Sequence, residues 1–166
     1  MRNLLITLFF FSSFCLFAQK LDVAQVFNPK TLGENSYVSD ENSVLSEQAR
    51  CNLNNICVAL EAEVGVEIAV VIVPGIVGDD EYDFAYDLFN TWRIGKEGKN
   101  NGLLWLYVVD IRAMKFETGY GLEGLLPDAY LNSLLDEDIF PLMREGRVDE
   151  AFIAGLTDIS SRLTTD

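Results

Sequence analysis

The chain has 166 residues, of which 26 are acidic, 12 are basic and none is histidine, so its formal net charge is −14. This excess of negative charge argues against nucleic acid as a partner, because the chain would repel the phosphate backbone. Without histidine, a Ser-His-Asp or Cys-His catalytic arrangement and a histidine-bound zinc site are excluded, and the length suits one domain of ordinary size.

Residues 1–18 have the pattern of a secretory signal peptide: Arg2, an apolar run over residues 4–17, then the small Ala18. The run is too short to span a bilayer, which takes about 20 apolar residues. We therefore expect cleavage after Ala18 and a soluble periplasmic or extracellular protein without a transmembrane anchor. The alternative is a lipoprotein anchored through Cys15, although the three residues before this cysteine make a poor lipobox.

The segment after the leader, residues 19–36, has no sustained hydrophobic period and is expected to be a loose lead-in or a short edge strand. The folded domain is expected over residues 37–164. Its first helix is predicted over Glu47–Glu63, where apolar residues recur on one face. Ser46 is placed to cap the helix start, and Gly65 to end the helix.

Two cysteines of this helix, Cys51 and Cys57, lie six positions apart. Six helical residues turn through about 240° and rise about 9 Å, so the two thiols are too far apart for a disulfide within the helix. Cys57 lies near the apolar face and is expected in the core. Cys51 points away from that face, where it is available to pair with another chain.

Two apolar runs predict buried strands, Glu67–Val73 and Leu103–Val109. Between them a helix is expected to begin at Asp79-Asp80, so that strand, helix and strand form a right-handed parallel crossover. A third strand, Met114–Thr118, is expected to turn back antiparallel to the second.

Three further helices are predicted, from about Asp128, around Phe140 and from about Asp149. Helices alternating with strands indicate the α/β class. The expected architecture is a three-layer αβα sandwich, in which helices flank a small mixed sheet made of the parallel crossover and the antiparallel hairpin.

This topology gathers four acidic residues at the carboxyl end of the parallel strands, the usual ligand-binding end of an open α/β sheet: Asp40, Asp79, Asp80 and Asp110. Carboxylate oxygens are the ligands that Ca²⁺ and Mg²⁺ prefer, so these residues are the candidate metal site. The structural alternative for Asp79 and Asp80 is helix capping. Asp110 with Arg112 is also the candidate catalytic pair of a phosphate-handling site, or a turn aspartate beside a solvent-exposed arginine.

The opposite end of the sheet receives an alternative polar cluster: Asn101, Gly121, Glu123 and Asp128. Gly121 belongs to a Gly-Tyr-Gly sequence too short for a dinucleotide fingerprint, which favours a turn role. Glu123 is either a ligand or a local acceptor for backbone N–H groups.

Several pieces of the sequence occur in a characteristic order: Val38-Ser39-Asp40, Leu45-Ser46, Trp92-Arg93-Ile94-Gly95, Asn101-Gly102, Asp110-Ile111-Arg112, Gly119-Tyr120-Gly121-Leu122-Glu123-Gly124 and Leu126-Pro127-Asp128-Ala129. Together they resemble the TPM domain, which occurs in thylakoid-lumen photosystem-repair proteins, acetylcholine-receptor modulators and exported bacterial proteins. The resemblance extends from about Tyr37 to Leu163. It implies an αβα sandwich on the non-cytoplasmic side of a membrane, with acid phosphatase activity proposed for some members and calcium binding for others.

Two departures from the family pattern bear on function. Asn100 stands where an aspartate commonly precedes Asn-Gly, and Ile111 stands where the second aspartate of Asp-Asp-Arg is usual. Each removes a carboxylate, which counts against metal affinity and phosphatase activity.

The leading hypothesis is an exported module that binds a divalent cation and acts with envelope or membrane proteins, in interaction or quality control. One alternative is a metal-assisted acid phosphatase, a phosphomonoesterase that uses Asp110 and Arg112. A second alternative is a purely structural interaction domain.

Overall fold

The structure is a computed structural model that describes residues 20–33, 36–78 and 80–165. The expected leader, residues 1–18, and Asp79 lie outside these ranges. None of the helices in the described residues is both long enough and apolar enough to cross a membrane.

The sheet has four strands in the order β1-β2-β3-β4: β1 (Val38–Ser39), β2 (Glu67–Val73), β3 (Gly102–Val108) and β4 (Ala113–Thr118). The first three strands are parallel, and β4 pairs antiparallel with β3. The register of β2 on β3 runs from Glu67 opposite Gly102 to Val73 opposite Val108. The predicted parallel crossover and antiparallel hairpin are therefore confirmed.

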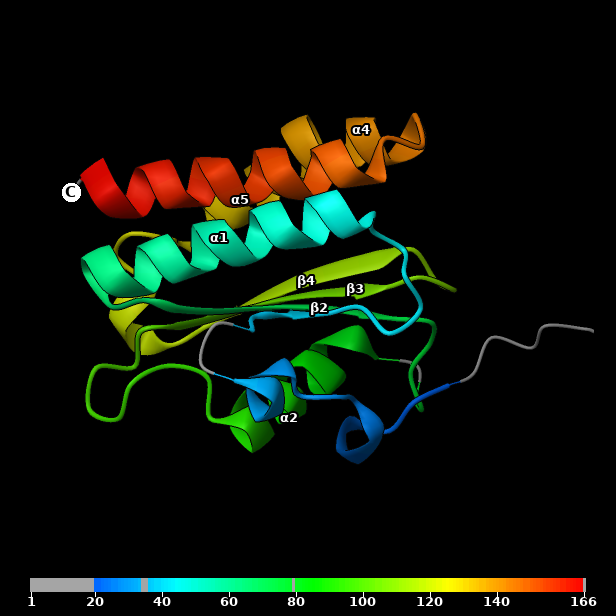
Figure 1. Ribbon diagram of the computed structural model, residues 1–166, viewed down its shortest axis with the longest axis horizontal. Helices are drawn as coiled ribbons and strands as arrows, with labels where there is room; N and C mark the ends of the chain where they lie inside the picture. The colour runs from blue at the N-terminus through cyan, green and yellow to red at the C-terminus, as the bar shows by residue number, and fades with distance from the viewer. Residues whose placement is uncertain (1–19, 34–35, 79, 166) are drawn as a thin grey trace, which may run out of the picture.

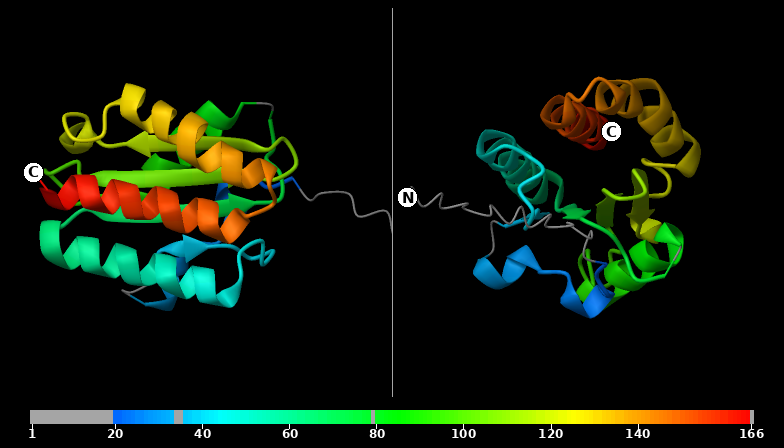
Figure 2. Two further views of the ribbon diagram at one scale, coloured as in Figure 1. Left: turned by 90° about the horizontal axis from the view of Figure 1, so that it is seen from above. Right: turned by 90° about the vertical axis from the view of Figure 1, so that its right-hand side faces the viewer.

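Helices cover both faces of this sheet, as the sandwich requires (Figure 1). One face carries α1 (Glu47–Val64), α3 (Asp128–Leu134), the π-helical segment η4 (Leu135–Ile139), α4 (Phe140–Arg144) and α5 (Val148–Thr165). The other face carries α2 (Glu81–Trp92). Figure 2 shows α1 and α5 side by side, and both helices start at the carboxyl end of the parallel strands.

Local sequence explains where the helices start and end. Ser46 Oγ accepts a hydrogen bond from the Ala49 amide at 3.1 Å, and α1 stops at Gly65, whose φ of 73° is left-handed. The α2 start is capped by Asp80, and the helix stops at Arg93 in the left-handed region.

Trp105, at the centre of β3, is fully buried and contacts two other aromatic rings of the core. Its ring stacks on Phe152 of α5 with centroids 4.5 Å apart and lies 5.0 Å from the ring of Phe116. A Cβ atom at Gly155 would lie 2.8 Å from the Trp105 ring, so α5 approaches the sheet closely because this residue is glycine. Cys57 is buried in this core, as expected, whereas Cys51 is exposed.

The lead-in was expected to be loose or a short edge strand, and the described part of it is ordered with a single strand-like bridge. Residues 20–33 form two short turns, η1 (Val23–Gln25) and η2 (Pro29–Leu32), and Leu21 makes a parallel β-bridge to Ile76. The segment packs on the α2 face of the sheet, with Val26 and Pro29 buried. Edge strand β1 begins at Val38, and it is too short for a periodic signal.

Candidate functional site

The carboxyl end of the sheet holds three of the four candidate metal ligands, Asp40, Asp80 and Asp110, because the three parallel strands point the same way. Asp40 follows β1, Asp80 precedes α2, and Asp110 follows β3. Asp79, the fourth, lies outside the described residues.

Asp40 is buried and fully engaged with its own loop. Its two carboxylate oxygens accept hydrogen bonds from the Val44 and Leu45 amides, each at 2.9 Å. Only 5% of this residue is exposed. The carboxylate therefore closes the loop that leads into α1, and a cation would have to compete with two backbone donors for it.

Asp80 serves as the α2 cap that the sequence suggested. Its Oδ1 accepts from the amides of Tyr82 at 2.8 Å and Asp83 at 3.3 Å. Its Oδ2 has no partner among the described residues, so one oxygen stays open to solvent.

Asp110 stands between the ends of β2 and β3. Its Oδ1 accepts from the Ile111 amide at 2.8 Å, and its own amide donates to the Pro74 carbonyl at 3.0 Å. A Cβ atom at Gly75 would lie 2.6 Å from Asp110 Oδ2, so Gly75 leaves the space that this carboxylate occupies. The side chain thus has a defined position at the sheet end, with Oδ2 unpaired among the residues described.

These carboxylates do not form a complete metal cage. Within the described ranges, no three acidic or cysteine side chains gather closely enough to hold an ion; Asp79 is outside that comparison. Ca²⁺ takes six to eight oxygen ligands. A cation at this end would therefore use one or two carboxylates, with backbone carbonyls and water supplying the rest.

The candidate catalytic pair lies within the hairpin turn between β3 and β4. Arg112 adopts a φ of 53°, its amide donates to the Val109 carbonyl at 3.2 Å, and its side chain lines a cavity between the hairpin and α4. Asp110 does not line that cavity. Of the two residues, Arg112 is therefore the one at this cavity, and their joint role stays a prediction.

At the amino end of the parallel strands, the Asn101 side chain connects the loop before β2 to the loop before β3. Its Oδ1 accepts from the Lys96 amide at 2.9 Å, and its Nδ2 donates to the Gly65 carbonyl at 2.7 Å. A Cβ atom at Gly121 would lie 2.2 Å from the Lys99 carbonyl oxygen, so this glycine permits a close backbone crossing. Both residues therefore have structural roles that account for their identity.

Glu123 and Asp128 are exposed, and among the described residues no hydrogen bond or ion pair joins either of them to Asn101. Asp128 acts on Glu117 through its charge. Burial raises the pKa of Glu117, the nearby Lys115 opposes the rise, and Asp128 adds to it. The alternative cluster is thus adjacent in the fold but not joined in one site.

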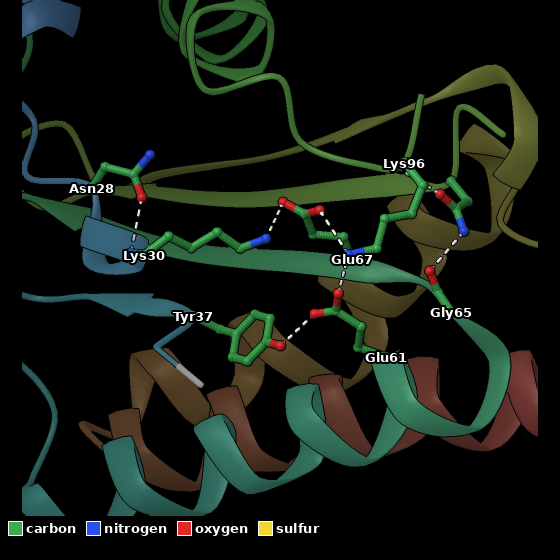
Figure 3. A network of polar contacts seen from close by, with 8 residues as sticks. Asn28, Lys30, Tyr37, Glu61, Gly65, Glu67 and Lys96 are labelled. Carbon is green, nitrogen blue, oxygen red and sulfur yellow. Dashed lines mark hydrogen bonds and ion pairs between the residues drawn. The ribbon is translucent and has the colours of Figure 1, made fainter. Parts of the chain in front are cut away.

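A charged network at this end was not expected (Figure 3). The buried carboxylate of Glu67 lies 2.5 Å from Lys30 Nζ and 3.8 Å from Lys96 Nζ. Lys96 also pairs with Glu61, which accepts a hydrogen bond from the Tyr37 hydroxyl. Glu67 is the residue from which the sequence could have indicated this network. A charged residue at the start of an otherwise apolar strand needs a partner when it is buried.

Electrostatics within the network favour the charged carboxylate. Burial alone would raise the pKa of Glu61, but hydrogen bonds from Lys96 and Tyr37, with the charges of Lys96 and Lys30, together lower it below its ordinary value of 4.5. Burial and the hydrogen bond to Glu61 raise the pKa of Tyr37. The network joins the lead-in, α1, β2 and the loop before β3. We therefore assign it a role in the stability of the fold.

Comparison with known proteins agrees with the resemblance to the TPM domain. The family model described as the TPM domain matches residues 38–162. The chain is similar to the N-terminal domain of a protein from P. gingivalis, with 34% identity, a TM-score of 0.79, and 87% of this chain and 92% of that one covered. No curated protein matches.

Two other solved structures share the fold at 16% identity. One is the BA42 protein from the psychrophilic bacterium Bizionia argentinensis, with a TM-score of 0.63 over 75% of this chain and 84% of that one. The other is the N-terminal domain of a Corynebacterium glutamicum protein, with a TM-score of 0.59 over 81% and 82%.

Proposed function

Because the chain belongs to the TPM domain family, we propose that it is an exported binding module that holds a divalent cation, Ca²⁺ or Mg²⁺, at the carboxyl end of its sheet. In this proposal it acts with envelope or membrane proteins rather than on a small substrate. Export is supported by the leader pattern of residues 1–18, and cation binding by the acidic composition of the chain.

The Asp110 carboxylate is the main support for a cation site. It is exposed, its position is set by the turn and by the space at Gly75, and Oδ2 has no partner among the described residues. An oriented carboxylate with an open oxygen needs little rearrangement to coordinate an ion. Asp80 offers a second open oxygen, and Asp79 is the remaining candidate ligand. Asp40 is a secondary ligand in this proposal, since its two oxygens already accept hydrogen bonds from the loop before α1.

The test is a titration with Ca²⁺ and then Mg²⁺, followed through amide chemical shifts. We expect saturable shifts around Asp80, Asp110 and Gly75, with a dissociation constant of about 10⁻⁴ to 10⁻³ M, the range of extracellular calcium modules. The Asp110→Asn variant should bind at least about tenfold more weakly. Asp136→Asn is the matched control, because Asp136 is exposed on η4 and makes no described contact with the site.

Three results would count against this assignment. Shifts around Asn101 and Glu123 would move the site to the other end of the sheet. Equal binding by the Asp110→Asn variant would remove Asp110 from the site. No saturable shift up to about 10 mM, well above that range, would leave a purely structural interaction domain as the better description.

A metal-assisted phosphomonoesterase is the second candidate, and the observation in its favour is Arg112. Its guanidinium has no acidic partner within 4.0 Å among the described residues, and such a group suits a phosphate. Turnover of p-nitrophenyl phosphate with Mg²⁺, lost in both Asp110→Asn and Arg112→Gln, would favour it. Turnover unchanged in either variant would contradict this residue assignment.

A further inference from the structure

The cavity that Arg112 lines is situated between the β3–β4 hairpin and the α4–α5 connection, on the face of the sheet away from α2. Figure 1 shows the hairpin turn and the α4–α5 connection at the same end of the molecule. The cavity measures about 550 Å³, within the range of about 300–1,000 Å³ that is usual for small-molecule sites.

Two arginines line this cavity, Arg112 from the hairpin turn and Arg144 from the end of α4. Neither guanidinium has an acidic partner within 4.0 Å among the described residues. In a chain with 26 acidic and 12 basic residues, two unpaired arginines at one cavity make a local exception to the overall charge. An anion is the ligand that such a pair favours.

The acidic residues around the α4–α5 connection are already engaged. Glu145 and Glu150 both pair with Arg147, at 2.8 and 2.5 Å. Asp149 Oδ1 accepts a hydrogen bond from the Ser46 amide at 3.0 Å. These carboxylates are therefore directed to other partners, which leaves Arg112 and Arg144 to face the cavity together.

The remaining walls are mainly apolar: Met114, Phe140 and Met143 line them with Tyr107. Methionine side chains adapt to ligands of different shape. The ring of Tyr107 is largely buried, and its hydroxyl makes no described hydrogen bond, so a donor is available beside the arginines. The cavity combines a cationic rim with an apolar interior.

We propose that this cavity binds a small amphipathic anion, an organic carboxylate with a short aliphatic chain. The carboxylate pairs with Arg112 and Arg144, and the chain contacts Met114, Phe140 and Met143. No acidic residue lines the cavity, so this site is independent of the proposed cation site, and either proposal stands if the other fails.

Methionine methyl groups give a direct test, because the sequence has only three methionines and two of them, Met114 and Met143, line the cavity. The full chain is labelled with ¹³C in the methionine methyl groups and titrated with octanoate. We expect saturable shifts of both cavity methyl signals. The neutral isostere 1-octanol should bind at least about tenfold more weakly, because it cannot form charge-assisted hydrogen bonds with the arginines.

Variants separate the arginine contacts from general electrostatics. Arg112→Gln and Arg144→Gln should each weaken octanoate binding about tenfold. Arg147→Gln is the matched control: it removes the same charge three positions from Arg144, but Arg147 is paired with two glutamates, so we expect a change of at most about twofold. Both exposed arginines can be replaced without disturbing the core, and amide spectra check the fold.

Several outcomes would overturn the proposal. Equal binding of octanoate and 1-octanol would reduce the cavity to an apolar site. If Arg147→Gln weakened octanoate binding as much as the two cavity variants, octanoate would be attracted by net charge alone. Inorganic phosphate that shifts both methyl signals at lower concentration than octanoate would assign the arginines to phosphate, and methyl signals that do not move would exclude the cavity.

Discussion

At the amino end of the parallel strands, charged side chains from distant segments contact one another, whereas at the carboxyl end Asp40, Asp80 and Asp110 contact their own loops or solvent. Lys30, Glu61, Glu67 and Lys96 form one connected network that spans four segments of the chain. At the other end, Asp80 and Asp110 each keep an oxygen without a described partner, and the cavity arginines are unpaired among the described residues. The difference indicates that the amino end maintains the fold, whereas the carboxyl end keeps charged groups without a described partner.

The largest loss of stability is expected when a side chain is added at the amino end where two backbone segments lie close together. In Gly102→Ala, the new Cβ would lie 2.2 Å from the Ile94 carbonyl oxygen, which belongs to backbone and cannot swing away. We expect a loss of about 4 kcal/mol or more in the free energy of unfolding, measured in urea.

Gly124→Ala is the control for this prediction, because a Cβ there meets nothing within 4 Å. Its free energy of unfolding should stay within about 1 kcal/mol of the parent. If Gly102→Ala proved as stable as Gly124→Ala, the close crossing at the start of β3 would be wrong.

The next largest effect is expected from the buried acid of the network. Glu67→Gln leaves Lys30 and Lys96 without their shared carboxylate, and we expect a loss of about 2 kcal/mol, below the usual cost for a fully buried pair because both lysines are partly exposed. Glu63→Gln, an exposed change on α1, should cost less than about 0.5 kcal/mol. Equal unfolding midpoints of the two variants would remove Glu67 from a structural role.

A smaller effect should appear in the pH dependence of stability. The pKa of Glu61 is lowered in the folded protein, so the unfolded chain binds more protons as the pH falls. The stability that Glu61 contributes is therefore present above its ordinary pKa of 4.5 and is lost as the pH falls through its folded value. Urea unfolding between pH 6 and 3 should show a steeper fall for the parent than for Glu61→Gln; parallel curves would contradict the shift.

The smallest effect is expected at the carboxyl end. Arg112→Gln and Arg144→Gln should each change the free energy of unfolding by less than about 0.5 kcal/mol, because neither exposed guanidinium has a described ion-pair partner. Lys96→Gln removes the same charge at the amino end and should cost about 1 kcal/mol, because it leaves Glu61 and Glu67 with fewer counter-charges. If these variants lost equal free energy of unfolding, the two ends of the sheet would not differ in their contribution to stability.

Features that depend on neighbouring residues were predictable from the sequence. The continuous apolar runs of β2 and β3 predicted buried strands, because both faces of these strands are covered. Ser46 and Asp80 predicted helix starts, since a cap acts within one turn. From these elements the crossover rule gave the relative position of Asp40, Asp80 and Asp110.

Features that depend on distant residues were not predictable. Strand β1 has two residues, too few for a period, and its pairing with β2 is decided by tertiary contact. The sequence carries no sign that Arg112 and Arg144 meet at one cavity, because they lie 32 positions apart, in the hairpin turn and in α4. The contacts of Asn101 were not predictable either, because its side-chain amide joins Lys96 to Gly65, which lies 36 positions before Asn101 in the sequence.

The β-bridge between Leu21 and Ile76 has a practical consequence for biochemical work. The Leu21 amide donates to the Gly75 carbonyl at 2.9 Å, so the described chain starts beside the carboxyl end of the sheet, whereas α5 finishes at the amino end (Figure 1). Immobilisation on a sensor chip through the last residues would orient the carboxyl end toward the solution. A purification tag joined just before Lys20 would instead lie next to the surfaces whose binding is to be measured.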